Sequence, residues 1–194
     1  RSRKKIAEIL NCKESEIYFT SGGSESNNIV LQGMLKAGDH FITSAYEHPA
    51  ISNVAKALEE KNIEVTYVKP SSEGIIEPEI IAEHIKNNTK MVSIMYANNE
   101  IGSTNPLNEI IKICKSKNII THTDAVQYVG KKNIDISELD IDLLSIGAHK
   151  FYGPKGIGAL YIKSGLLVDP LILGGGQEKG ISPGTENVSL ISGM

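Results

Sequence analysis

The sequence predicts an α/β fold with a mostly parallel sheet flanked by helices. Short apolar runs that are typical of strands alternate with amphipathic helical patterns over most of the 194 residues. No internal repeat and no linker-like stretch interrupts this alternation, so we expect a single domain over residues 1–194. The composition, 40% hydrophobic and 22% charged residues, is that of a globular protein with an ordinary core.

The expected strands share an apolar composition and end in small polar residues. They cover residues 16–20, 40–44, 64–68, 91–96, 119–123, 143–146 and 158–162. Two expected helices start at Pro78 and Pro106, where a missing N–H costs nothing. The helices cover residues 25–36, 50–61, 78–86 and 106–117, after an amphipathic helix at the basic N-terminus. From Lys163 onward the Gly-rich sequence predicts little regular structure.

Charge and cysteine content exclude several classes of protein. The formal net charge of −3 gives no basic surface for nucleic acid, so small molecules or proteins are the expected partners. No apolar run reaches the ~18 residues that a membrane span needs, and we expect a cytoplasmic protein. Cys12 and Cys114 are too few for a disulfide framework or a zinc site, and their surroundings predict inert thiols. We expect no metal site.

Polar residues concentrate directly after the C-terminal ends of five expected strands. They lie at residues 20–24, 47–48, 98–100, 124–127 and 149–150. In a parallel sheet these ends share one edge, and open α/β sheets bind ligands there. The sequence therefore predicts that the five clusters converge on one crevice.

Residues 21–24, Ser-Gly-Gly-Ser, form the candidate phosphate cradle. Small residues let the backbone approach a ligand, and the helix that follows offers free N–H groups and the positive end of its dipole. The same residues also fit a plain strand-to-helix turn with Ser24 as the N-cap. This stretch alone does not decide between the two.

Lys150 is the candidate nucleophile. It follows an apolar run over residues 141–146, where desolvation would lower the pKa of an amine and let it bind an aldehyde cofactor. Asp124 follows another apolar strand, and a carboxylate there could keep a pyridinium nitrogen protonated, as in pyridoxal phosphate chemistry. Asp124 also fits an N-cap or turn, and His48 fits either a ring-stacking acid–base residue or a structural histidine.

These residues belong to a set of motifs that resembles the cysteine desulfurases, within the class V aminotransferase group of pyridoxal phosphate enzymes. The motifs run in order across nearly the whole chain, and the set is far more specific than any one of them. They are FTSGGSESNN at residues 19–28, EH at 47–48, NNEIG at 98–102, HTDAVQ at 122–127, LSIGAHKFYGPKG at 144–156, GGGQE at 174–178 and GTEN at 184–187.

The resemblance implies the large cofactor domain of a fold-type I transferase that binds pyridoxal 5'-phosphate. Lys150 would form the covalent bond to the cofactor aldehyde, and Asp124 would pair with the pyridine nitrogen. Gln127 would hydrogen-bond the phenolic oxygen. His48 would stack on the ring and shuttle protons, which makes Lys150 and His48 the implied catalytic residues. Asn99 would lie near the substrate carboxylate and a cofactor oxygen.

The resemblance also implies how the phosphate is held. Gly23, Ser24 and His149 would bind it within one chain. Thr185 would reach the phosphate of the other subunit, so the resemblance implies a homodimer with shared active sites.

The implied activity is conversion of L-cysteine to L-alanine, with the sulfur passed to an enzymic cysteine as a persulfide. A sulfur-acceptor protein or an iron–sulfur cluster scaffold would receive it. In the family the accepting cysteine and the arginine that binds the substrate carboxylate lie beyond residue 194. We therefore expect a chain truncated at both ends, without the small C-terminal domain, that is inactive by itself.

Two positions depart from the family pattern. Gly147 stands where a serine or threonine usually gives a hydroxyl to the phosphate, and Ser182 stands where an arginine is usual. Two other interpretations stay open: a selenocysteine lyase or another class V lyase or aminotransferase, and a non-catalytic, cofactor-binding or dimerising scaffold for sulfur-relay partners.

Overall fold

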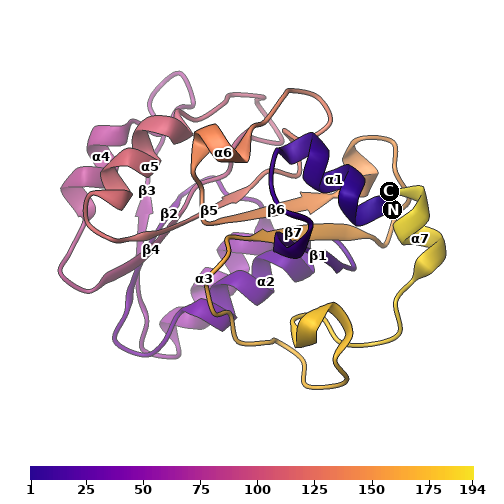
Figure 1. Ribbon diagram of the computed structural model, residues 1–194. Coiled ribbons are helices and arrows are strands. Elements are labelled where there is room, and N and C mark those ends of the chain that lie inside the picture. Colours follow the sequence, from indigo (N-terminus) through magenta and orange to yellow (C-terminus); the bar gives the residue numbers. More distant parts are fainter.

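A computed structural model describes all residues from 1 to 194 and contains one seven-stranded sheet (Figure 1). The strand order is β1-β7-β6-β5-β4-β2-β3. The strands are β1 (Ile17–Thr20), β2 (His40–Ser44), β3 (Glu64–Val68), β4 (Thr89–Ser93), β5 (Ile120–Asp124), β6 (Leu143–Gly147) and β7 (Gly158–Ile162). The α/β architecture with a mostly parallel sheet is confirmed.

Helices cover both faces of this sheet (Figure 1). One layer consists of α2 (Gly23–Met34) and α3 (Pro49–Glu59), whose apolar residues pack in one core cluster. The other face carries α1 (Ser2–Leu10), α4 (Pro78–His84), α5 (Leu107–Lys115) and α6 (Ile136–Leu139). A last helix, α7, spans Val188–Gly193. No helix combines the length and the apolar character needed to cross a bilayer.

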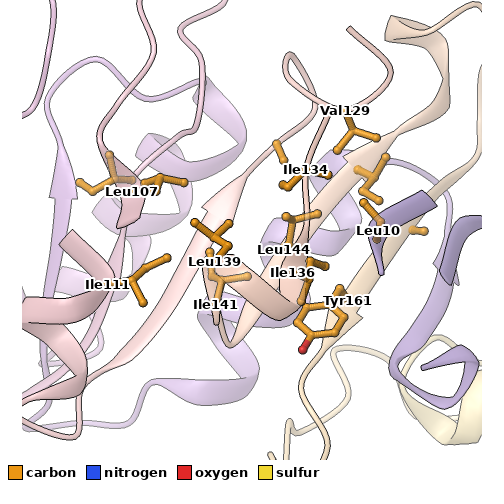
Figure 2. Packing of buried hydrophobic residues seen from close by; sticks show 14 of the residues in the cluster. Leu10, Leu107, Ile111, Val129, Ile134, Ile136, Leu139, Ile141, Leu144 and Tyr161 are labelled. Carbon is orange, nitrogen blue, oxygen red and sulfur yellow. The ribbon is translucent and has the colours of Figure 1, made fainter. Parts of the chain in front are cut away.

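The larger core cluster lies under α1, α5 and α6. Figure 2 shows Leu139 from α6 beside Leu144 of the sheet, with Leu10 from α1 on one side and Leu107 and Ile111 from α5 on the other, all in one cluster. These side chains are at most 5% exposed. Their burial removes apolar surface from water and fixes each helix against the strands.

The direction of β1 depends on β7. Strands β2 to β6 are all parallel to one another, whereas β7 is antiparallel to both of its neighbours, β6 and β1. Gly158 at the start of β7 pairs with Thr20 at the end of β1 and with Gly147 at the end of β6. Strand β1 therefore points the same way as β6, and its C-terminal turn lies at the same edge of the sheet.

Most expected elements lie within two residues of the observed ones, and β4 is the main exception. It spans Thr89–Ser93 and not residues 91–96, because Ser93 is the last residue that pairs with β2. The chain stays extended beyond it, and the Ile94 and Tyr96 N–H groups still donate to carbonyls of β5. Neither α6 nor α7 was expected from the sequence.

Two helix starts also differ from expectation. Helix α2 begins at Gly23 with Gly22 as its N-cap, so the interpretation of Ser24 as the N-cap is wrong. Pro106 is the N-cap of α5 and not its first helical residue, whereas Pro78 does occupy the first turn of α4.

An ion pair fastens the C-terminal segment to the edge strand β1. The Arg3 guanidinium donates to both carboxylate oxygens of Glu178, at 2.8 and 2.6 Å, and also to the Ile17 carbonyl. Glu178 accepts a further hydrogen bond from the Phe19 N–H at 2.9 Å. A bidentate pair of this kind fixes orientation as well as distance. It holds Glu178, in the C-terminal segment, against α1 and β1.

Gly158 has no room for a side chain. A Cβ there would lie 2.4 Å from the Ile146 carbonyl oxygen and 2.7 Å from the Gly22 Cα, and both are backbone atoms. We expect Gly158→Ala to lower the free energy of unfolding by about 3 kcal/mol in urea denaturation, because overpacking against backbone cannot relax cheaply. Gly176→Ala is the control, with no atom within 4 Å of its Cβ and an expected change within about 0.5 kcal/mol. Equal midpoints for the two variants would contradict the close contact.

Candidate active site

A cleft of about 410 Å³ opens at the edge of the sheet where β1, β5 and β6 end. All five predicted polar clusters contribute side chains or backbone to it. The predicted site residues that line it are Gly23, Ser24, His48, Asn99, Asp124, Gln127, His149 and Lys150. Thr185 does not line it and lies in a neighbouring cleft of about 440 Å³. The sequence therefore located the crevice and its polar wall.

The turn between β1 and α2 is built to leave helix N–H groups free. Its N-cap, Gly22, has a φ of 151°, a region that favours glycine, and it offers no side-chain cap. The Ser26 hydroxyl donates to the Gly22 carbonyl at 3.2 Å and lies 2.9 Å from the Thr20 hydroxyl, which fixes the turn. A Cβ at Gly23 would lie 2.6 Å from Val126, so this turn packs against the loop after β5. The arrangement suits an anion.

Glu25 lies in the wall that separates the two clefts. Its carboxylate accepts hydrogen bonds from the Ser21 N–H at 2.5 Å and from the Ser182 hydroxyl at 2.6 Å. Ser21 and Glu25 line both clefts, and Thr185 lies only three residues after Ser182. The segment that carries Thr185 is thus hydrogen-bonded to the candidate phosphate turn.

Asp124, the last residue of β5, is a buried acid at the cleft. Its Oδ2 accepts a hydrogen bond from Asn27 Nδ2 at 2.7 Å, and its Oδ1 accepts one from the Val126 N–H at 3.0 Å. Burial raises the pKa of Asp124, while these two bonds and nearby His48 oppose the rise. A cationic partner in the cleft would favour the charged carboxylate further.

Asn27 lies within the FTSGGSESNN motif, and the motif alone indicates no role for it. It is fully buried on α2, and its Oδ1 has no hydrogen-bond partner. The sequence spacing indicates that Asn27 is buried, because Val30 and Leu31 lie three and four residues later on the same buried helix face. A polar residue on an apolar helix face signals a buried partner.

His48 is both a structural residue and a cleft residue. It is the N-cap of α3, and its Nδ1 accepts a hydrogen bond from the Ala50 N–H at 3.1 Å. This bond places the proton of the neutral ring on Nε2. The two interpretations of His48 that the sequence left open are therefore compatible.

Glu47 is a buried acid that the sequence did not single out. Its Oε1 accepts hydrogen bonds from the Ser44 hydroxyl at 2.6 Å and the Met95 N–H at 2.9 Å, and its Oε2 has no partner. Burial raises the pKa of Glu47 to about 8, against the two bonds, and the negative charge of Asp124 adds to the rise. Glu47 therefore tends to keep its proton near neutral pH.

Asn98 and Asn99 are neighbours in the sequence but differ in burial and in role. Asn98 is buried, and its Oδ1 accepts the Glu100 and Ile101 N–H groups at 2.9 and 3.0 Å, which closes the turn after β4. Asn99 is exposed and lines the cleft. The buried neighbour fixes the backbone that presents the exposed one.

Lys150 and His149 lie on a short 3-10 turn, Ala148–Lys150, that follows β6. Both are exposed, so the expected desolvation of Lys150 is not found. The reason is local: the chain leaves the sheet at Gly147, and the turn carries these two residues out of the core. Partial burial lowers the pKa of His149, and the charges of Lys150 and Lys155 lower it further.

Neither cysteine lies in the cleft lining. Burial raises the pKa of Cys12 and of Cys114 to about 12, so both thiols stay protonated near neutral pH. No group of three or more His, Cys, Asp or Glu residues is arranged to hold a metal ion.

A mostly parallel sheet with a polar cleft at the strand ends, lined by a buried carboxylate and a lysine, is the arrangement of the pyridoxal phosphate proteins of fold type I. The sequence profile of the family described as Aminotransferase class-V matches residues 1–191. The chain belongs to this family. Class V aminotransferases and cysteine desulfurases are pyridoxal phosphate enzymes.

The curated relatives that match the whole chain are described as cysteine desulfurases. Cysteine desulfurase IscS of Clostridium botulinum (strain Hall) is 48% identical over 197 residues, covering 100% of this chain and 50% of its own length. The IscS protein of Dictyoglomus turgidum gives the same percentages. A solved structure described as SspA in complex with cysteine has a TM-score of 0.96 at 41% identity, covering 99% of this chain and 57% of that one. The chain spans about half the length of the curated relatives it matches.

The raised pKa of Glu47 predicts a pH-dependent contribution to stability. The folded value, about 8, lies above the ordinary 4.5, so between these pH values the unfolded chain releases a proton that the folded chain keeps. The contribution is full below the lower value and is lost as pH rises toward 8. Glu47→Gln cannot ionise, so its stability relative to wild type should rise by on the order of 3 kcal/mol between pH 5 and pH 8.

Urea denaturation at a series of pH values measures this difference. Glu59→Gln is the matched control, since Glu59 is an exposed residue at the end of α3. A difference between Glu47→Gln and wild type that stays constant with pH would show that Glu47 is charged in the folded protein throughout.

Proposed function

We propose that this chain is the cofactor-binding large domain of a cysteine desulfurase, an enzyme that converts L-cysteine to L-alanine. The observation that carries the proposal is the meeting of Lys150, Asp124 and the uncapped N-terminus of α2 in one cleft. The cysteine desulfurases that match the whole of this chain support the choice within the family.

The residues of the cleft fit pyridoxal 5'-phosphate. The turn at Gly22 and Gly23 suits a phosphate, the buried carboxylate of Asp124 suits a ring cation, and Lys150 offers an amine to an aldehyde. When bound, this cofactor supplies an electron-withdrawing ring that stabilises the charge left as a proton leaves the substrate α-carbon. The 410 Å³ of the cleft falls within the range usual for cofactor sites.

Three side chains would hold the ring. Lys150 Nζ would bind the cofactor covalently and then accept or release a proton beside the α-carbon. Asp124, fixed by Asn27 and the Val126 N–H, would keep the ring nitrogen protonated through a charge-assisted bond. Gln127 would donate to the phenolic oxygen.

His48 and Asn99 would act on the substrate side. The imidazole ring of His48 would stack over the cofactor ring. Its Nδ1 is engaged by the Ala50 N–H, so Nε2 is the atom that would move a proton. Asn99 would orient the substrate carboxylate, and its exposure leaves the amide free to do so.

The phosphate would be held by Gly23, Ser24 and His149. Thr185 lies in the adjoining cleft, and this position supports the proposal that it serves the phosphate of a second copy. The functional unit would then be a homodimer with shared sites, working in the cytoplasm.

The sulfur-accepting thiolate would be neither Cys12 nor Cys114, because both thiols are shielded and keep their protons. We therefore expect residues 1–194 on their own to bind the cofactor without completing sulfur transfer. A sulfur-acceptor protein or an iron–sulfur cluster scaffold would be the partner that receives the sulfur.

Cofactor attachment tests the proposal directly. Pyridoxal phosphate added to the purified chain should give an absorption band that borohydride fixes, and peptide mapping should place the label on Lys150. Lys150→Ala should lose the band, whereas Lys155→Ala, a nearby exposed lysine, should keep it. Label spread over surface lysines in the wild-type chain would contradict the proposal.

Gly147 has no hydroxyl that could donate a hydrogen bond to a bound phosphate. A Cβ at this position would lie 3.3 Å from Val126 and 3.4 Å from the His149 ring, and both are side chains that can shift. We expect Gly147→Ser to bind pyridoxal phosphate about tenfold more tightly, since a charge-assisted hydrogen bond contributes roughly 1.5–3 kcal/mol. Fluorescence titration measures the affinity. Gly147→Ala supplies the Cβ without the hydroxyl, and an equal gain in that variant would contradict the explanation.

A further inference from the structure

Two buried side chains behind the cleft link the turns that present His48 and Asn99. We propose that Glu47 and Asn98 form a cross-brace, with Glu47 as its main positioning residue, that sets how His48 and Asn99 stand relative to the cofactor ring and substrate. The inference rests on the proposed function. Neither Glu47 nor Asn98 lines the cleft itself, so each acts through its neighbour in sequence.

The first link of the cross-brace runs from the turn after β2 to the chain after β4. Glu47 Oε1 accepts the Met95 N–H at 2.9 Å, and the Ser44 hydroxyl, at 2.6 Å, fixes the same oxygen. His48 follows Glu47 directly and caps α3. Met95 is itself part of the cleft lining. This link therefore ties the start of α3 to the wall on which the ring would rest.

In the second link the side chain comes from the turn after β4 and reaches the backbone of the turn after β2. Asn98 Nδ2 donates to the Tyr46 carbonyl at 3.2 Å, while Asn98 Oδ1 holds the turn that contains Asn99. The two links thus join residues 46–47 to residues 95–98 twice, with both donors on residues 95–98 and both acceptors on residues 46–47. Two bonds a few residues apart prevent rotation of one turn against the other, which a single bond would allow.

Asn105 adds two further hydrogen bonds between the turn after β2 and the chain after β4. Its Nδ2 donates to the Met95 carbonyl at 2.7 Å, and its Oδ1 accepts the Tyr46 hydroxyl at 3.1 Å. Both backbone groups of Met95 are therefore fixed by buried side chains. A displacement of about 1 Å in a positioning contact can cost a large factor in binding or rate, so rigidity at this point has a functional use.

The neutral form of Glu47 suits this task. A protonated carboxyl keeps Oε1 as a carbonyl-type acceptor for two hydrogen bonds and adds no charge beside Asp124. The raised pKa of Glu47 agrees with this form. The negative charge at the ring nitrogen then belongs to Asp124 alone. Glutamine reproduces the shape and the acceptor of that neutral acid, and alanine removes both.

Cofactor binding to variants tests the cross-brace. We expect Glu47→Gln to bind pyridoxal phosphate within about threefold of wild type, with the same visible circular dichroism of the bound cofactor. Glu47→Ala should bind at least tenfold more weakly and lose much of that signal, because His48 is no longer fixed. Glu59→Ala, an exposed glutamate on α3, is the matched control and should resemble wild type.

Asn98→Asp tests the second link without changing shape. It keeps Oδ1 for the turn and replaces the donor to the Tyr46 carbonyl with an oxygen, so it should also weaken cofactor binding at least tenfold. Far-ultraviolet circular dichroism checks that each variant is folded. Wild-type affinity and signal in Glu47→Ala would overturn the proposal, and so would equal losses in Glu47→Gln and Glu47→Ala.

Amide hydrogen exchange without cofactor separates this inference from the proposed function. The Met95 N–H should exchange at least tenfold faster in Glu47→Ala than in wild type and should stay protected in Glu47→Gln. Absence of pyridoxal phosphate binding by the wild-type chain would contradict the proposed function. Unchanged Met95 exchange in Glu47→Ala would overturn the cross-brace, whether or not the chain binds the cofactor.

Discussion

The insertion of β7 between β1 and β6 is the constraint on which the site depends. Because β7 is antiparallel to both neighbours, β1 runs in the same direction as β6, and the β1–α2 turn opens onto the edge where Lys150 lies. The absence of a side chain at Gly158 lets that turn approach the sheet closely. With a side chain at that point, the candidate phosphate turn could not pack so closely against the ends of β6 and β7.

The buried residues of the sheet next to Asp124 are polar but uncharged. His122, two residues before Asp124 on β5, bridges Ser93 of β4 at 2.8 Å and Ser145 of β6 at 3.0 Å. Burial lowers the pKa of His122 to about 3, so its ring is neutral and each nitrogen can be satisfied by a hydroxyl. Satisfied buried networks are rigid. Asp124 therefore stands on a fixed base that adds no competing charge.

Much of the fold and the outline of the site could be predicted from the sequence. Apolar strands with polar residues at their ends located the cleft, and the ordered motifs indicated the family. The supporting residues could not be found in this way. Glu47 and Asn98 resemble their cleft-facing neighbours in the sequence, and only burial separates the two roles. The exposure of Lys150 was also missed, because strand periodicity does not show where the chain leaves the sheet.

The sequence by itself determined the alternation of strands and helices, the polar clusters at the strand ends and the resemblance to cysteine desulfurases. Local patterns of burial and turn chemistry are enough for these. Only the tertiary structure decided the strand order, the direction of β1 and the partners of the buried acids. Asn27 and Asp124 are 97 positions apart, and Glu47 and Met95 are 48 apart. Such hydrogen bonds depend on how distant elements pack, and no local pattern in the chain encodes that.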